Sequence, residues 1–106
     1  MGWFANGVSS GTALAEQLAP QGKTCVLDGV NVYIPGGAGT SAAFITLRTG
    51  LSDTGTFSSF GLAATTGGNV NIVSGSGGII KSKYVGVAAT TNSGTSNFVN
   101  IWGHYE

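Results

Sequence analysis

The sequence predicts an all-β fold, a single antiparallel β-sandwich or jelly roll of seven or eight short strands. Valine, isoleucine, phenylalanine and tyrosine recur in alternating runs along the 106 residues. Glycine-bearing turn signals separate these runs at intervals of roughly ten residues, which is the spacing of sandwich strands rather than of βαβ units. The chain has 19 glycines and 2 prolines, and this composition favours turn-rich β structure. Its length indicates one domain.

Residues 1–11 are predicted to form an extended arm, and residues 12–106 the sandwich domain. The arm has a bulky apolar tip (Met1, Trp3 and Phe4) that is followed by Asn, Gly and Ser residues. Such a segment shows no strand pattern and loses much entropy when it docks. We therefore expect Trp3 and Phe4 to be buried against another chain. The alternative is that the arm folds back over its own sandwich.

The segment 12–20, TALAEQLAP, is the only part of the chain with helical character. Leu14 and Leu18 are four residues apart, and Pro20 ends the pattern. The segment is too short to be stable as an isolated helix. One helical turn and an irregular strand both remain open.

From residue 23 onward the apolar residues follow the period of two that marks half-buried strands. Strands are expected at residues 25–34, 43–49, 57–60, 62–65, 69–73, 79–80, 84–89 and 97–105. The alternation predicts an inward-facing set made of Val30, Val32, Ile34, Ile45, Leu47, Val70, Ile72, Val85, Val87, Val99 and Ile101.

The larger aromatic residues have two possible roles. They are Tyr33, Phe44, Phe60, Tyr84, Phe98, Trp102 and Tyr105. We expect most of them to fill the sandwich core, whereas the alternative is that they line a sugar-binding face. Trp102 and Tyr105, near the end of the chain, are candidates for an interface with another protein.

Charge and cysteine content narrow the function classes. The chain has 4 basic and 4 acidic residues, so it lacks the basic surface that binds a phosphate backbone, and nucleic-acid binding is not expected. A protein with so few charges has low solubility as a free monomer, and this favours assembly with copies of itself or with a partner. Cys25 is the only cysteine and is expected to be a buried small residue at a strand start. The sequence predicts neither a signal peptide nor a membrane-spanning helix.

The titratable residues do not predict an enzyme. The acids are Glu16, Asp28, Asp53 and Glu106, and the only histidine is His104. A dyad of Cys25 and His104 is possible in principle, but a buried thiol and a surface imidazole are the expected roles. No catalytic residue, cofactor or metal is predicted.

Two charged features have plain structural interpretations. In the loop 52–56, Asp53 is the only charged oxygen ligand, so a hairpin turn is expected rather than a calcium site. Lys81 and Lys83 are expected to be solvated charges at a strand end, where they prevent edge pairing. A salt bridge to a neighbouring molecule is the alternative for them.

A set of short motifs lies between roughly residues 24 and 103: Ile45-Thr46-Leu47, Ser52-Asp53, Phe57, Lys83-Tyr84-Val85-Gly86-Val87 and Ser93-Gly94-Thr95. In these motifs the sequence resembles small jelly-roll virion proteins of tailed bacteriophages, in particular the capsid decoration or cement group. Gly86 departs from the pattern, which usually has a basic or polar residue there.

The resemblance implies a non-enzymatic protein made in the host cytoplasm and located on the capsid surface of the virion. Proteins of this group reinforce subunit junctions, often as trimers, so the implied partners are copies of the same chain and the major capsid protein. Met1, Trp3, Phe4, Trp102 and Tyr105 are the candidate interface residues. The alternative function is a receptor- or carbohydrate-binding module of a tail fibre, which an exposed aromatic platform with nearby Asn and Asp would favour.

Overall fold

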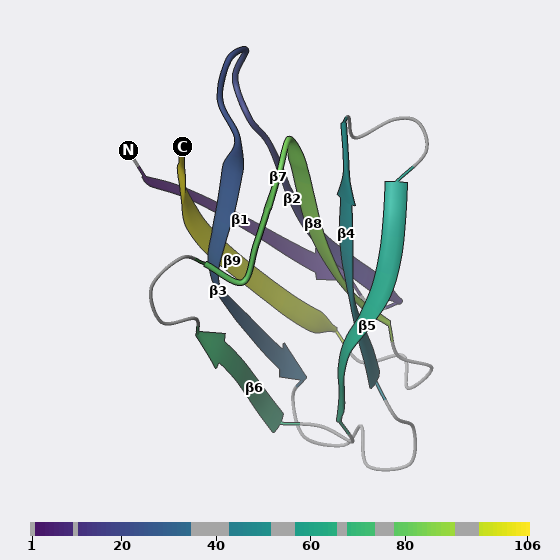
Figure 1. Ribbon diagram of the computed structural model, residues 1–106. Helices are drawn as coiled ribbons and strands as arrows, with labels where there is room; N and C mark the ends of the chain where they lie inside the picture. Colours follow the sequence, from purple (N-terminus) through teal and green to yellow (C-terminus); the bar gives the residue numbers. More distant parts are fainter. Residues whose placement is uncertain are drawn as a thin grey trace.

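The computed structural model consists of two antiparallel sheets packed face to face, so the predicted all-β sandwich is confirmed (Figure 1). The structure describes residues 2–9, 11–34, 43–51, 57–65, 68–73, 78–90 and 96–106, without the side chains of residues 43, 57–60, 62–65 and 68. Its strands are β1 (Gly2–Ser9), β2 (Thr12–Leu18), β3 (Cys25–Ile34), β4 (Ala43–Gly50), β5 (Phe57–Thr65), β6 (Gly68–Val73), β7 (Ile80–Ser82), β8 (Tyr84–Thr90) and β9 (Asn97–Tyr105).

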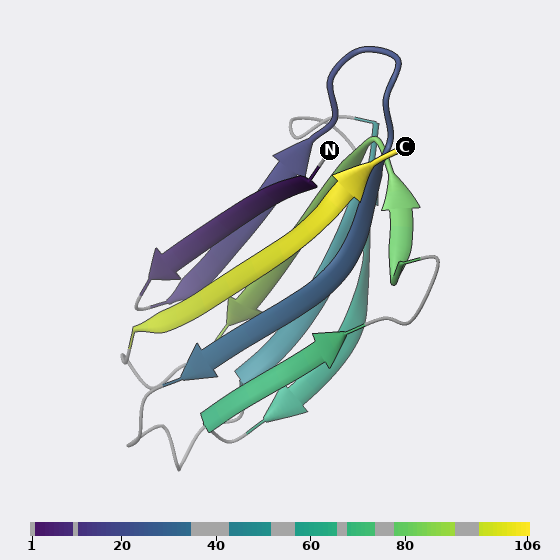
Figure 2. The same cartoon turned by 90° about the vertical axis from the view of Figure 1, so that its left-hand side faces the viewer.

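The strand order is that of a jelly roll. Sheet A has the order β1-β9-β3-β6, with the short β7 also paired to β3, and sheet B has the order β2-β8-β4-β5. The pairs β1–β9, β2–β8, β3–β6 and β4–β5 are nested antiparallel partners, as in one long hairpin rolled into two layers. Figure 2 shows sheet A face on, with β1 and β6 at its two edges.

The N-terminal segment is part of the sandwich, which corrects the prediction of an arm at residues 1–11. Strand β1 pairs with β9 along its whole length, from Gly2 opposite His104 to Ser9 opposite Asn97. Backbone hydrogen bonds to β9 hold this segment as a strand, although its sequence does not show a strand pattern. The next segment is strand β2, so of the two open alternatives for residues 12–20 the strand is correct.

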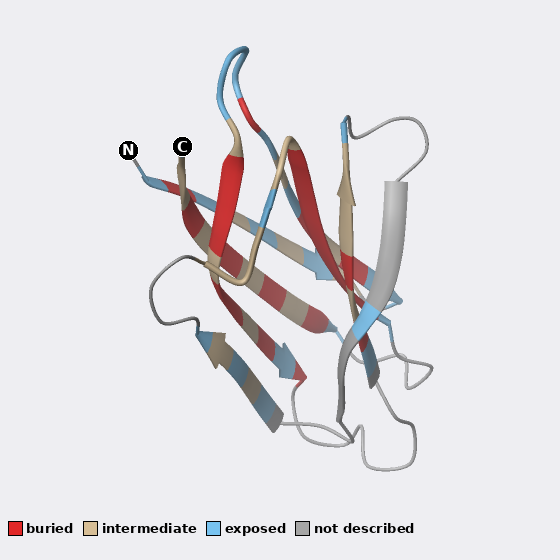
Figure 3. Ribbon diagram, in the orientation of Figure 1, coloured by how far each residue is buried: buried red, intermediate tan, exposed pale blue. Residues whose placement is uncertain are grey.

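The core is aliphatic and follows the predicted alternation. Nine residues of the predicted inward set are at most 1% exposed, and Val70 and Ile72 are partly buried against them. Figure 3 shows the alternation along β9, where buried residues alternate with intermediate ones. Cys25 is fully buried at the start of β3, as expected, and burial raises the pKa of its thiol.

Trp3 completes the core at the edge of sheet A. It is 8% exposed, and it lies over Gly103, where an added Cβ would come within 2.6 Å of the indole atom Cζ2. The indole Nε1 donates a hydrogen bond of 3.1 Å to the carbonyl oxygen of His104. Trp3 therefore holds β1 to its own domain, and the prediction that another chain buries it is wrong.

Candidate interaction surface

The outer face of sheet A carries a row of four asparagines that crosses the four long strands of the sheet. Strand pairing places Asn6 opposite Asn100, Asn100 opposite Asn31, and Asn31 opposite Asn71. Each lies between residues that point to the other side of its strand, so all four side chains share the outer face. We call this set the asparagine row.

Hydrogen bonds join three of these amides in one direction. The Nδ2 of Asn100 donates to the Oδ1 of Asn31 at 3.3 Å, and the Nδ2 of Asn31 donates to the Oδ1 of Asn71 at 2.6 Å. Aligned amide bonds polarise one another and fix the side-chain positions. These three amides therefore form an ordered polar strip across β9, β3 and β6 rather than a set of independent surface residues.

Apolar and aromatic residues flank the asparagine row on both sides. One flanking row pairs Val8 with Phe98, Phe98 with Tyr33 and Tyr33 with Asn69, and the other consists of Phe4, Trp102, Gly29 and Val73. Phe4 is 62% exposed, Val8 60%, Tyr33 39% and Val73 67%. None of the twelve positions in the three rows is charged.

Two ring arrangements give this surface its shape. The rings of Tyr33 and Phe98 pack with centroids 6.0 Å apart, a distance typical of aromatic pairs. The indole of Trp102 lies across Gly29, since a Cβ at Gly29 would sit 2.0 Å from its Cζ2 atom. Glycine at this position lets the ring lie against the sheet.

The candidate interface residues divide between the two sides of sheet A. Phe4 and Trp102 lie on the outer face, as an interface requires. Tyr105 is partly buried against the core, and its hydroxyl accepts a hydrogen bond of 2.5 Å from Nε2 of Gln17 in the other sheet. Met1 lies outside the described residues.

The expectation that most large aromatics fill the core is wrong. Tyr84 is 1% exposed, but Phe44 is 58% exposed, Tyr33 is exposed, and Phe98 and Trp102 are only half-buried. Their positions in the alternation explain this, because each lies on the opposite side of its strand from the inward aliphatic residues. The side chain of Phe60 is outside the described set.

Sequence reasoning did not identify the asparagine row. A signal was present, since the triplets Val30-Asn31-Val32, Val70-Asn71-Ile72 and Val99-Asn100-Ile101 place asparagine between two inward-facing aliphatic residues. Each triplet indicates an outward amide on its own strand. Only the strand register places the amides side by side.

No protein family model, curated protein or solved structure matches this chain.

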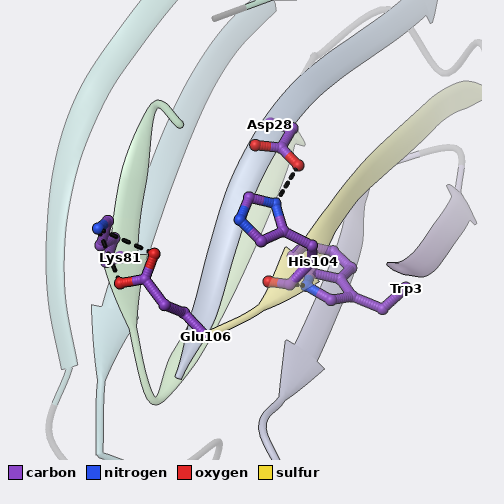
Figure 4. A network of polar contacts seen from close by, with 5 residues as sticks. All are labelled: Trp3, Asp28, Lys81, His104 and Glu106. Carbon is purple, nitrogen blue, oxygen red and sulfur yellow. Dashed lines mark hydrogen bonds and ion pairs between the residues drawn. The ribbon is translucent and has the colours of Figure 1, made fainter. Parts of the chain in front are cut away.

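A second polar cluster ties the C-terminal end of β9 to its neighbours (Figure 4). His104 Nδ1 lies 2.6 Å from Oδ2 of Asp28, which is at the bulge in β3. Lys81 donates to both carboxylate oxygens of Glu106, at 2.8 and 3.1 Å. These hydrogen bonds and the attraction of the Lys81 charge lower the pKa of the Glu106 carboxyl. The cluster fastens the end of the chain to β3 and β7.

This cluster does not form the dyad considered from the sequence. The imidazole of His104 is hydrogen-bonded to the carboxylate of Asp28. Cys25 Sγ instead lies 3.7 Å from the backbone oxygens of Gln17 and Lys83. Strand pairing sets Val26, not Cys25, opposite His104. The thiol and the imidazole are therefore separate features of the structure.

The other expectations about charged residues have mixed outcomes. Lys81 is exposed and forms its ion pair within its own chain, while Lys83 donates a hydrogen bond of 2.6 Å to the carbonyl oxygen of Pro20. The loop Ser52 to Thr56, with Asp53, lies outside the described residues. The described part of the chain holds no cluster of three metal-ligating side chains, encloses no pocket, and has no helix able to span a membrane.

Tyr84 is a buried tyrosine on the outer side of sheet B. The hydroxyl of Tyr84 lies over Gly86, where an added Cβ would come within 2.6 Å of it, and it donates a 2.6 Å hydrogen bond to Oε2 of Glu16. Burial, the hydrogen bond to Glu16 and the charge of Glu16 raise the pKa of Tyr84 to about 12, against the lowering effect of Arg48.

We expect the unfolding free energy to fall in alkaline solution because of Tyr84. The unfolded tyrosine ionises near its ordinary value of 10.0, whereas the folded one ionises at about 12, so this stabilisation is full below pH 10 and is lost as the pH rises through the folded value. Absorbance titration should show a tyrosinate component near pH 12, and Tyr84→Phe should remove it. A titration with the same highest-pH component in Tyr84→Phe would contradict the assignment.

Proposed function

We propose that the protein is a non-enzymatic structural protein of a bacteriophage virion, of the capsid decoration or cement type. It acts by binding protein surfaces, and the outer face of sheet A is its contact surface. Its partners are copies of itself and the major capsid protein, and its location is the outside of the phage head. The observation that carries the proposal is the uncharged area formed by the three rows on the outer face of sheet A, with four large apolar side chains exposed on it.

This surface has the composition of a protein interface. Interface centres are depleted of charge and enriched in aromatic residues, and contiguous exposed apolar patches mark sites where proteins bind. The asparagine row supplies hydrogen-bonding groups that can pair with a partner once water is excluded. Jelly rolls serve in viral capsids and in lectins, so the fold supports a virion role by analogy only.

A glycan-binding function is the second candidate, because one observation favours it. The indole of Trp102 lies across Gly29 beside the asparagine row, and sugar rings stack on such flat aromatic surfaces while amides bind their hydroxyls. On this hypothesis the protein would be a carbohydrate- or receptor-binding module associated with the phage tail.

Sedimentation separates the two functions. We expect the purified protein to sediment with heads of the phage that encodes it, at a saturating ratio to the capsid protein, and soluble oligosaccharides not to compete. Retention on insoluble polysaccharide without binding to heads would contradict the proposal and support the second candidate. In that case Trp102→Ala should abolish retention, whereas Phe44→Ala, an aromatic change on the outer face of sheet B, should not.

A further inference from the structure

Strand β1 is an edge strand without the usual protection against pairing. It lies at the end of sheet A and pairs with β9 on one side only. Its sequence, GWFANGVS, contains neither a charged residue nor a proline. Natural edge strands usually carry lysine, proline or a bulge, because their unpaired backbone groups otherwise pair with another strand.

The outer side of β1 is complementary to itself. Phe4 and Val8 lie two residues before and two residues after Asn6, on the same face, and are 62% and 60% exposed. In an antiparallel pair of β1 strands centred on Asn6, the two Asn6 residues are opposite each other. Each Phe4 is then opposite the other copy's Val8. Apolar residues meet apolar residues and amide meets amide.

The edge strands β6 and β2 are less self-complementary in the corresponding registers. In β6, centring a pair on Asn71 would set the polar Asn69 opposite Val73. In β2, the outer side carries the acidic Glu16, and like charges that meet across an edge oppose pairing. The side chains of β5 are only partly described, so that edge is not compared.

We propose that two copies of this chain associate through antiparallel pairing of their β1 strands, with the twofold axis at Asn6. The pairing joins the two A sheets into one and extends the asparagine row across both copies. A primary amide has two N–H donors and one acceptor oxygen, so the two Asn6 side chains can bond each other reciprocally. The contact is isologous, because both copies use the same strand, and it therefore gives a closed dimer.

This inference deepens the proposed function by identifying the self-contact, and it differs from the trimer that the sequence resemblance implies. It does not need the capsid. A dimer that fails to bind heads would refute the decoration role and leave the β1 contact intact, whereas a monomer that binds heads would do the reverse.

Cysteine substitution tests the register directly. In antiparallel pairs, directly opposite Cα atoms are about 4.5–5.5 Å apart, which suits a disulfide. With oxidised glutathione, Asn6→Cys should form a disulfide-linked dimer, and so should the double variant Phe4→Cys/Val8→Cys. Val8→Cys alone should not, since the predicted register sets it opposite Phe4. The wild type is the control, because its single Cys25 is fully buried.

Mass measurement by light scattering or sedimentation tests the same contact without a covalent link. Val8→Lys should raise the dimer dissociation constant about tenfold or more, because each dimer loses two apolar contacts and gains two charges on the paired edge. Phe44→Lys, at a position of similar exposure (58%, against 60% for Val8) on the outer face of sheet B, should leave the dissociation constant unchanged. A monomeric wild type, a linked dimer of Val8→Cys equal to that of Asn6→Cys, or disruption by Phe44→Lys alone would overturn the proposal.

Discussion

Replacing Trp3 with alanine is expected to lower the free energy of unfolding by about 3–5 kcal/mol, the usual cost of removing a large buried aromatic side chain. Trp3 is 8% exposed, it covers Gly103, and its indole nitrogen is bonded to the carbonyl oxygen of His104. The substitution would create a cavity where β1 meets β9. Chemical denaturation of the monomer, followed by circular dichroism, measures the effect.

The neighbouring Phe4 provides a matched control. It is 62% exposed and on the other face of the same strand, so Phe4→Ala should change the unfolding free energy of the monomer by no more than about 0.5 kcal/mol. Equal effects of the two substitutions, or no effect of Trp3→Ala, would show that the N-terminal segment is not held in the sandwich.

A second large loss is expected from Gly103→Ala, about 3 kcal/mol on the scale of overpacked cores. An added Cβ would lie 1.9 Å from the backbone oxygen of Val26 and 2.6 Å from Cζ2 of Trp3. Val26 cannot move away freely, because β3 is paired with β9 at that point. The melting temperature and the denaturation midpoint should both fall.

Gly61→Ala is the matched control for this glycine substitution. Gly61 is exposed in strand β5, and an added Cβ there would meet nothing within 4 Å. Alanine restricts the unfolded chain, so the stability should be unchanged or slightly higher. If Gly103→Ala were as harmless as Gly61→Ala, the close packing of Trp3 and Val26 around Gly103 would be incorrect.

The sandwich could be predicted because inward-facing residues repeat every second position in several separate segments. Val30, Val32 and Ile34 identify one buried side of β3 without any knowledge of the strands that pair with it. Such a pattern is local, so it can be recognised in a sequence. The nested pairing that makes the sandwich a jelly roll depends on contacts between distant strands, and it follows from the structure.

Strand β1 could not be predicted because its inward side has no regular apolar pattern. That side carries Trp3, Ala5, Gly7 and Ser9, whereas the larger apolar residues Phe4 and Val8 face outward. Hydrophobic periodicity therefore gives the wrong expectation, and pairing with β9 decides the structure. The candidate surface was missed for a related reason, since its rows cross four strands and no single segment contains more than a part of them.

The central claim is that the outer face of sheet A, rather than that of sheet B, contacts the partner. Two aromatic residues provide a direct comparison, since Tyr33 on sheet A is 39% exposed and Phe44 on sheet B is 58% exposed. Head binding by Tyr33→Arg and Phe44→Arg, each checked for folding by circular dichroism, should be measured by sedimentation at equal protein concentration. We expect Tyr33→Arg to lose binding and Phe44→Arg to bind like the wild type. Loss of binding in Phe44→Arg, with Tyr33→Arg unaffected, would contradict the account.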